Sequence, residues 1–551
     1  MSGLAWPIRL EGVLNCSRDG TLPWVVGEQI SGWNRWDVSR ARENPIHPIT
    51  QADVRPAHNG NRHSRLPALD GHVTVRTNFL SEDSRLPVQH YPPGFTDRST
   101  PWHHALFVVL LGTLAALTWM GGLLLSGQSL LDTPQSTDLE KYRTAANHIL
   151  EHGTYLPTTD RLPVYPLIIA ATFLLFGSNN LMAVLLVNCL FTGGTVLAVA
   201  MSAAMIRQSW LFPTTILAMF WPNLIYPATL VLPDTVFAFF SAWGFFFLLK
   251  NIKQNQNNIK YSLVSGLFFG IAYMTKGAIL IWPVILFVFL YFHNRFAMKR
   301  RRRYAALMAI LPVTVMMICT IPQFLRNYQN FGILTYTTHA YSHTPFLAAC
   351  LTEPWGCGTA DEKNMVAIRT EAERRISTMP RSAQENYAIR LMVVREVVID
   401  FILEIPVPQL IKAVIGGEIR FLFHSISSMI LERFQIQRWH PSLEIFHGSK
   451  QLTAFSTVGT LIWLISILFV FLTRMIQLVG IVSGLKQSSL RWQTIAILLF
   501  VFTVSVSVVS IGNPRYRAPL EPVFILLTMM GTNHIQKFWH RNKSSSLSRT
   551  R

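Results

Sequence analysis

Acidic side chains are concentrated between residues 126 and 163, directly after the first long apolar segment. Five carboxylates stand there in a protein that has few elsewhere: Asp132, Asp138, Glu140, Glu151 and Asp160. Carboxylates are suited to deprotonating a hydroxyl group or to holding a divalent cation. This stretch therefore predicts a chemically active loop.

Further charged residues stand where apolar segments end. They are Asp234 after Pro233, Lys276 in a short polar turn, Arg326 before Asn327, and Arg515 and Arg517 around Tyr516. Guanidinium groups match the geometry of phosphate oxygens. Each residue also has a simpler explanation: an Asp caps a helix, and a cation at the end of a span anchors it at the membrane interface.

The composition is typical of a membrane protein. Half of the 551 residues are hydrophobic and only 14% are charged, whereas soluble domains are nearer a quarter charged. The net charge of +19 does not require a nucleic-acid partner, because cytoplasmic loops of membrane proteins collect Lys and Arg. Basic runs at 295–303 and 537–551 lie beside apolar spans, as that rule predicts.

Residues 1–104 differ from the rest of the chain. They contain eleven Arg and no Lys, are rich in Pro, His and Trp, and have no sustained helical or strand period. Three interpretations stay open: a mostly disordered cytoplasmic tail, upstream sequence translated from a misassigned start, or a functional N-terminal module.

The remaining sequence predicts an all-α polytopic membrane protein with about ten transmembrane helices, interfacial helices and an external subdomain. A transmembrane core covers 105–325 and includes a first external loop at 126–180. Its expected spans include 211–230, and a hairpin of 261–274 and 278–292 whose outer turn holds Lys276. An external subdomain covers 326–451, C-terminal transmembrane helices cover 452–532, and a basic cytoplasmic tail covers 533–551. Cys350 and Cys357 fall in the external part, as a local disulfide or as two free thiols.

Two segments of the first external loop need separate treatment. Residues 138–153 have apolar side chains at spacings of three and four, which predicts an amphipathic helix on the membrane surface. Residues 165–176 are apolar but too few to cross a bilayer, so we expect an interfacial or re-entrant segment. If this segment crossed the membrane, the basic run at 295–303 would lie outside.

With this topology, the carboxylates of the first loop, Asp234, and the cations around residues 276, 326 and 515 all face the external side. A carboxylate that activates a hydroxyl acceptor, together with arginines that bind phosphate, is typical of transfer from a phosphate-linked donor. The sequence therefore favours an enzyme that works at the external membrane surface.

Four motifs occur in an order and spacing that resemble a known family. They are Asp138-x3-Tyr142-x2-Ala145 followed by Arg161-x-Pro163-x-Tyr165-Pro166-Leu167; Leu232-Pro233-Asp234; Leu325-Arg326-Asn327-Tyr328-x2-Phe331-Gly332; and Arg515-Tyr516-x2-Pro519-x3-Pro522. Together they resemble GT-C membrane glycosyltransferases, in the bacterial branch related to protein mannosyltransferases and to the aminoarabinose transferase of lipid A. The resemblance covers about residues 105–530, and residues 1–104 have no counterpart.

This resemblance implies an inverting transfer from a polyprenyl-phosphate sugar donor, with Asp138 as the base or as the group that orients the acceptor. It implies supporting carboxylates at Asp234 and Asp160, and donor-phosphate binding by Arg515, Arg517, Lys276 and Arg326. The sequence departs from the pattern in two places: Leu139 follows Asp138 where many relatives have an acid, and Asp160-Arg161-Leu162-Pro163 is an imperfect match. Metal dependence therefore stays open, with no certain cofactor and a divalent cation as the alternative.

The expected partners are a polyprenyl-phosphate-linked sugar, membrane lipids, and a glycan, lipid or protein acceptor, with no nucleic acid. The preferred location is the bacterial inner membrane, and an endoplasmic-reticulum enzyme would obey the same physics.

The alternative function is a lipid-linked sugar flippase or another polytopic transporter. Transporters often place charges near the bilayer centre and contain inverted repeats; a third alternative is a non-catalytic scaffold.

Overall fold

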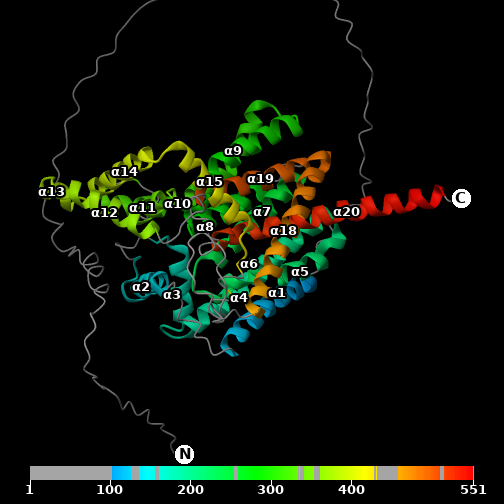
Figure 1. The fold of residues 1–551 in the computed structure, drawn as a ribbon, viewed down its shortest axis with the longest axis horizontal. Helices are drawn as coiled ribbons and strands as arrows, with labels where there is room; N and C mark the ends of the chain where they lie inside the picture. The colour runs from blue at the N-terminus through cyan, green and yellow to red at the C-terminus, as the bar shows by residue number, and fades with distance from the viewer. Residues whose placement is uncertain are drawn as a thin grey trace, which may run out of the picture. The chain divides into compact units, whose positions relative to one another are not determined.

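A computed structural model describes most of the chain after residue 101 (Figure 1). The described residues are 102–125, 136–155, 161–253, 259–332, 334, 340–352, 360–426, 430, 457–508 and 514–549. The expectations for residues 1–101, and for Asp132 and Asp160, lie outside them.

Every regular element in these ranges is a helix. The first half contains α1 (Trp102–Leu125), α2 (Ser136–His152), α3 (Val164–Phe176), α4 (Leu181–Ile206), η3 (Gln208–Trp210), α5 (Leu211–Met219), α6 (Pro222–Ile225), η4 (Tyr226–Thr229), α7 (Asp234–Lys253), α8 (Ile259–Tyr273), η5 (Gly277–Ile279), α9 (Trp282–Phe292), η6 (His293–Ala297) and α10 (Arg302–Phe331). The second half contains α11 (Ala340–Cys350), α12 (Ala360–Ser377), α13 (Arg381–Glu385), α14 (Tyr387–Glu404), α15 (Val407–Phe423), α18 (Thr457–Lys486), α19 (Ser488–Val508), η7 (Pro514–Leu520) and α20 (Glu521–Arg549).

The predicted all-α membrane fold is confirmed. By length and composition, seven described helices can cross a bilayer: α1, α4, α7, the η5–η6 segment that includes α9, α10, the part of α18 from Leu464 onward, and α19. The apolar helices α3 and α8 are shorter, with 13 and 15 residues. The expected total of about ten also counted residues 211–230, α8 and the apolar start of α20.

One predicted span is broken in the structure. We expected residues 211–230 to form a single span, but the helix ends at Met219 and two short turns follow, α6 and η4. Pro222 explains the break, because it holds the preceding Trp221 in an extended conformation and cannot donate a backbone hydrogen bond. The turns are buried and bring the chain to Asp234 at the start of α7.

The amphipathic helix predicted at 138–153 forms as α2, but protein covers much of its apolar side. Tyr142 and Ala146 are buried and pack, with Tyr165 of α3, into one apolar cluster. Of the predicted apolar positions, Leu150 is exposed. The reason is that α3 lies beside α2 and offers it an apolar surface, a contact that a periodicity pattern does not reveal.

The membrane helices pack in a chain of neighbours, in which α4 contacts α1 and α7, α8 contacts α7 and α10, and α18 contacts α20. The α18–α20 crossing depends on small residues. A Cβ at Gly531 would overlap the Ile476 carbonyl oxygen, and one at Gly480 would overlap the Leu527 carbonyl oxygen. Close backbone approach at small residues is a common way to associate membrane helices.

Gly531→Ala is therefore expected to separate α18 from α20 and to lower the free energy of unfolding by about 1–3 kcal/mol, as overpacking does. Thermal unfolding in detergent measures the effect. Gly122→Ala in α1 is the matched control, because a Cβ there meets no atom within 4 Å. Equal melting temperatures for the two variants would contradict the proposed close crossing.

Part of the segment that follows α10 forms a small helical cluster of its own. Helices α11, α12 and α14 share a buried apolar core made by residues such as Ala349, Ile368 and Val394. The expected boundary at residue 326 is displaced, because α10 continues to Phe331 and ends at Gly332 in the left-handed conformation. Helix α15 also differs from expectation, since it packs on η7 and α18. Cys350 is disulfide-bonded, so it is not a free thiol.

Candidate active site

Asp138 stands in the first turn of α2, where the partial positive charge of a helix N-terminus favours an anion. Its carboxylate accepts a hydrogen bond from Arg161 at 2.5 Å and lies 3.8 Å from the guanidinium of Arg515. About a third of the side chain, 32%, is exposed. Arg161 also lies over the ring of Tyr142, one turn along α2.

Asp234 begins α7 and is fully buried. Lys276 donates a hydrogen bond to one of its carboxylate oxygens at 2.5 Å, and Arg515 Nε lies 3.2 Å from the other. Two cations therefore compensate one buried carboxylate, as a buried charge requires.

Arg515 joins the two carboxylates. It lies on η7 and forms ion pairs with Asp138 and Asp234, with only 11% of its side chain exposed. Burial disfavours its charged form, but the nearby carboxylates outweigh burial and raise the pKa of Arg515 above its usual value. It is therefore a permanent cation held between two acids.

The neighbouring Tyr516 adds an aromatic surface. Lys276 lies over its ring at 4.2 Å from the centroid, and Arg515 lies at 5.4 Å. Burial lowers the pKa of Lys276, whereas Asp234 counteracts that shift; burial also raises the pKa of the Tyr516 hydroxyl. The cluster thus combines three cations, Arg161, Lys276 and Arg515, with two carboxylates. A surplus positive charge of this kind attracts an additional anion.

The other predicted residues lie elsewhere. Arg326 lies over the ring of Tyr155, whose hydroxyl donates to the Arg161 carbonyl at 2.8 Å, so it is at the edge of the cluster. Glu140 is exposed and pairs with Arg143, so it does not join Asp138.

Arg517 corrects our expectation most clearly. Its side chain is fully buried and pairs with Glu521 at 2.6 Å, in a network apart from Asp138 and Asp234. The geometry of η7 explains why Arg515 and Arg517 have different partners. A 3-10 helix has about three residues per turn, so side chains two residues apart point in different directions. A donor phosphate therefore has no access to Arg517 in this conformation.

The sequence-based assignment omitted two members of the cluster, Arg161 and Tyr516. Both belong to quoted motifs, and Arg161 directly follows Asp160. The signal that identifies them is their place next to a predicted site residue, but their roles depend on contacts between distant segments.

A metal site is not evident in the part of the chain that the structure describes. These residues include no group of three or more His, Cys, Asp or Glu side chains placed to hold a metal ion. Asp138 and Asp234 instead each have basic partners. The divalent-cation alternative stays a prediction, and no step below depends on it.

Asp234→Asn is expected to destabilise the protein strongly. Removal of one partner from a buried ion pair takes away the carboxylate that compensates Lys276 and leaves Arg515 with the more distant Asp138; such a loss costs about 3–5 kcal/mol. The matched control is Asp400→Asn, since Asp400 pairs with Arg375 but is half exposed, and such surface pairs contribute at most about 1 kcal/mol. Similar melting temperatures for the two variants would refute the structural role of Asp234.

Residues 160–322 match the family model described as dolichyl-phosphate-mannose-protein mannosyltransferase. Over these residues, the match agrees with the resemblance to protein mannosyltransferases that the sequence motifs indicated. This family-model match covers less than a third of the chain and includes Arg161, Asp234 and Lys276, whereas Asp138 and Arg515 lie outside it. No curated protein matches the chain.

Solved structures of similar proteins give weaker likenesses. The archaeal oligosaccharyltransferase AglB from Archaeoglobus fulgidus, in complex with an inhibitory peptide and a dolichol-phosphate, has 14% identity and a TM-score of 0.45, over 81% of this chain and 52% of that one. ArnT from Cupriavidus metallidurans bound to undecaprenyl phosphate has 14% identity and a TM-score of 0.33, over 77% of each chain. The chain thus spans about half the length of AglB.

Proposed function

We propose that this protein is a glycosyltransferase of the external membrane surface. It moves a sugar from a polyprenyl-phosphate donor to a hydroxyl-bearing acceptor, with inversion at the anomeric carbon. The observation that carries this proposal is the convergence of Asp138, Arg161, Asp234, Lys276 and Arg515 from five separate segments of the chain into one charged cluster. Isolated interfacial anchors would not need to meet.

The exposure of the two carboxylates supports different roles for them. Asp138 is about a third exposed, whereas Asp234 is fully buried between two cations. An acceptor hydroxyl can therefore reach Asp138 but not Asp234. Asp138 orients the acceptor and takes its proton, and Asp234 holds Arg515 and Lys276 in place.

The cations support binding of the donor phosphate. Arg515 and Lys276 lie on either side of Asp234 and are both largely buried, so their charge is only weakly screened by water. In the reaction, the acceptor oxygen bonds to the anomeric carbon while the bond from that carbon to the phosphate oxygen breaks. The phosphate keeps the bonding electrons, and the two cations stabilise the charge that develops there.

The chemistry of the donor also bears on where the protein works and on what it binds. The donor is a membrane lipid, so the cluster lies near the external surface of the membrane, preferably that of the bacterial inner membrane. The acceptor is a glycan, a lipid or a protein.

A donor panel tests the proposal. The purified protein in nanodiscs is incubated with several polyprenyl-phosphate sugars and candidate acceptors, and the release of free polyprenyl phosphate is followed. Consumption of one donor, with a product of inverted anomeric configuration by NMR, is the expected result. If a folded protein consumes no donor with any acceptor and instead moves lipid-linked sugar between leaflets, the flippase alternative is correct.

A further inference from the structure

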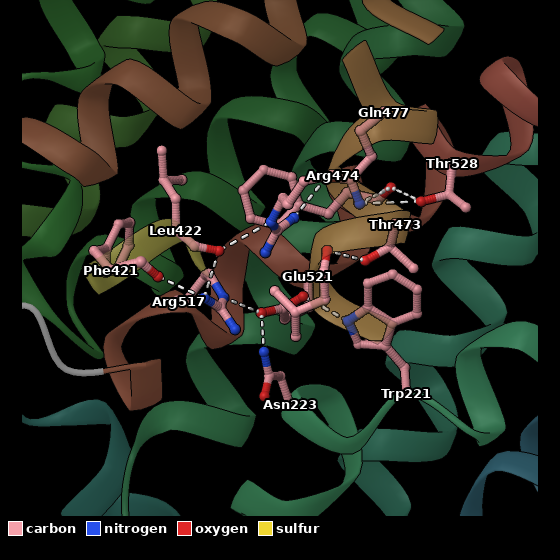
Figure 2. A network of polar contacts seen from close by, with 12 residues as sticks. Trp221, Asn223, Phe421, Leu422, Thr473, Arg474, Gln477, Arg517, Glu521 and Thr528 are labelled. Atoms are coloured by element: carbon pink, nitrogen blue, oxygen red, sulfur yellow. Dashed lines mark hydrogen bonds and ion pairs between the residues drawn. The ribbon is translucent and has the colours of Figure 1, made fainter. Parts of the chain in front are cut away.

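A second buried polar network contains Arg517, which stands two residues after Arg515 in the chain (Figure 2). Its centre is the carboxylate of Glu521, the first residue of α20, which is fully buried. This carboxylate accepts hydrogen bonds from Arg517 at 2.6 Å, from Asn223 at 2.8 Å and from the indole of Trp221 at 2.5 Å. Its full burial excludes direct contact with a substrate.

The network also holds the end of α15. Arg517 donates to the carbonyls of Phe421 and Leu422, and Arg474 of α18 donates to Leu422 at 2.9 Å, as Figure 2 shows. Two guanidinium groups at a helix C-terminus satisfy its last carbonyls and complement its dipole. The α15 segment is thereby fixed to η7 and α18.

The same carboxylate connects two of the five backbone segments that form the charged cluster. Arg517 stands two residues after Arg515 on η7, and Trp221 and Asn223 belong to the buried turns that lead to Asp234. A 3-10 helix has poor internal hydrogen bonds, so η7 depends on outside contacts for its position. Glu521 therefore bonds to η7 through Arg517 and to the buried turns through Trp221 and Asn223.

We propose that Glu521, with Arg517, is a positioning residue that sets Arg515 against Asp234. Its effect on turnover rests on the proposed function, but the geometry does not. Stabilisation alone explains the network less well, because buried ion pairs are often no more stable than apolar replacements. Their best-supported role is to specify one arrangement, here the orientation of Arg515.

Glu521→Gln in the full-length protein tests this inference, since it keeps the side chain's shape and removes its charge. In a cryo-EM structure in nanodiscs, the Arg515 Nε to Asp234 distance is expected to increase from 3.2 Å to more than the roughly 4 Å limit of an ion pair. Because a small displacement of a binding group is costly, we expect the donor KM to rise by up to about 10²-fold, with the acceptor KM unchanged.

Glu418→Gln is the matched control. Glu418 lies on α15, and burial raises the pKa of its carboxyl, so a neutral amide suits its environment. The Arg515–Asp234 distance and the donor KM should then equal those of the wild type. Glu521→Asp keeps the charge and should restore part of the donor affinity; it also serves as the test variant if Glu521→Gln does not fold.

Two results would overturn the inference. One is an unchanged Arg515–Asp234 distance in Glu521→Gln. The other is a lower melting temperature and a lower maximal rate with an unchanged donor KM, since that pattern indicates a stabilising role only. If the wild type consumes no donor, the proposed function fails, and the cryo-EM distance still decides the role of Glu521.

Discussion

Asp138→Asn is expected to lower kcat by roughly 10²- to 10⁴-fold, the usual contribution of a positioned general base. An amide keeps the size of the side chain but cannot take the acceptor's proton. The substitution should leave membrane insertion and the melting temperature nearly unchanged, because Asp138 is partly exposed and its ion pairs are partly screened. Activity assays at saturating donor, paired with thermal unfolding, measure both effects.

Glu140→Gln provides the control for this variant. Glu140 lies two residues away on α2, is exposed, and pairs with Arg143 at 2.8 Å. Its neutralisation removes the same charge from the same helix without a change in the cluster. Near wild-type turnover in Asp138→Asn, or an equal loss in Glu140→Gln, would contradict the assignment of Asp138 as the base.

Arg515→Lys is expected to lower kcat/KM by about 10²- to 10³-fold, as the loss of one preorganised charge-stabilising group does. Lysine keeps the positive charge, but it lacks the planar fork through which Arg515 reaches Asp138 and Asp234 together. The binding of free polyprenyl phosphate should weaken as well. Titration of the purified variant with that lipid measures this effect without turnover.

Arg381→Lys is the corresponding control, because Arg381 of α13 is exposed and pairs only with Glu385 among the described residues. It should bind polyprenyl phosphate as the wild type does. Unaltered donor KM and lipid binding in Arg515→Lys would place the donor phosphate elsewhere.

The sequence predicts local features of this fold well. Apolar length and periodicity identify α2, the short α3 and the hairpin around Lys276, whose helices α8 and α9 begin and end close to the predicted residues. These predictions succeed because each depends on side chains within one segment. Pro222 is itself a signal for the break at Trp221–Pro222, because proline interrupts a helix. The apolar run around it nevertheless favoured a continuous span.

The arrangement of the site depends on contacts that a sequence pattern does not contain. Asp138, Asp234, Lys276 and Arg515 were all predicted as site residues, and the structure brings them together. Arg515 and Arg517 were indistinguishable in the sequence, because each is an arginine next to Tyr516. They differ only in their neighbours. Arg517 donates hydrogen bonds to Glu521 of α20 and to a carbonyl at the end of α15, almost a hundred residues earlier in the chain.

The most direct test of the account is a single-turnover comparison with a donor that the wild type consumes. Three proteins are compared: the wild type, Asp138→Asn and Glu140→Gln. Each protein, in molar excess over the polyprenyl-phosphate sugar, is mixed with that donor and its acceptor, and the release of free polyprenyl phosphate is followed over time. The account predicts fast release by the wild type and Glu140→Gln, and release slower by at least about 10²-fold by Asp138→Asn. Equal rates for all three proteins would contradict the central claim that Asp138 carries the chemistry.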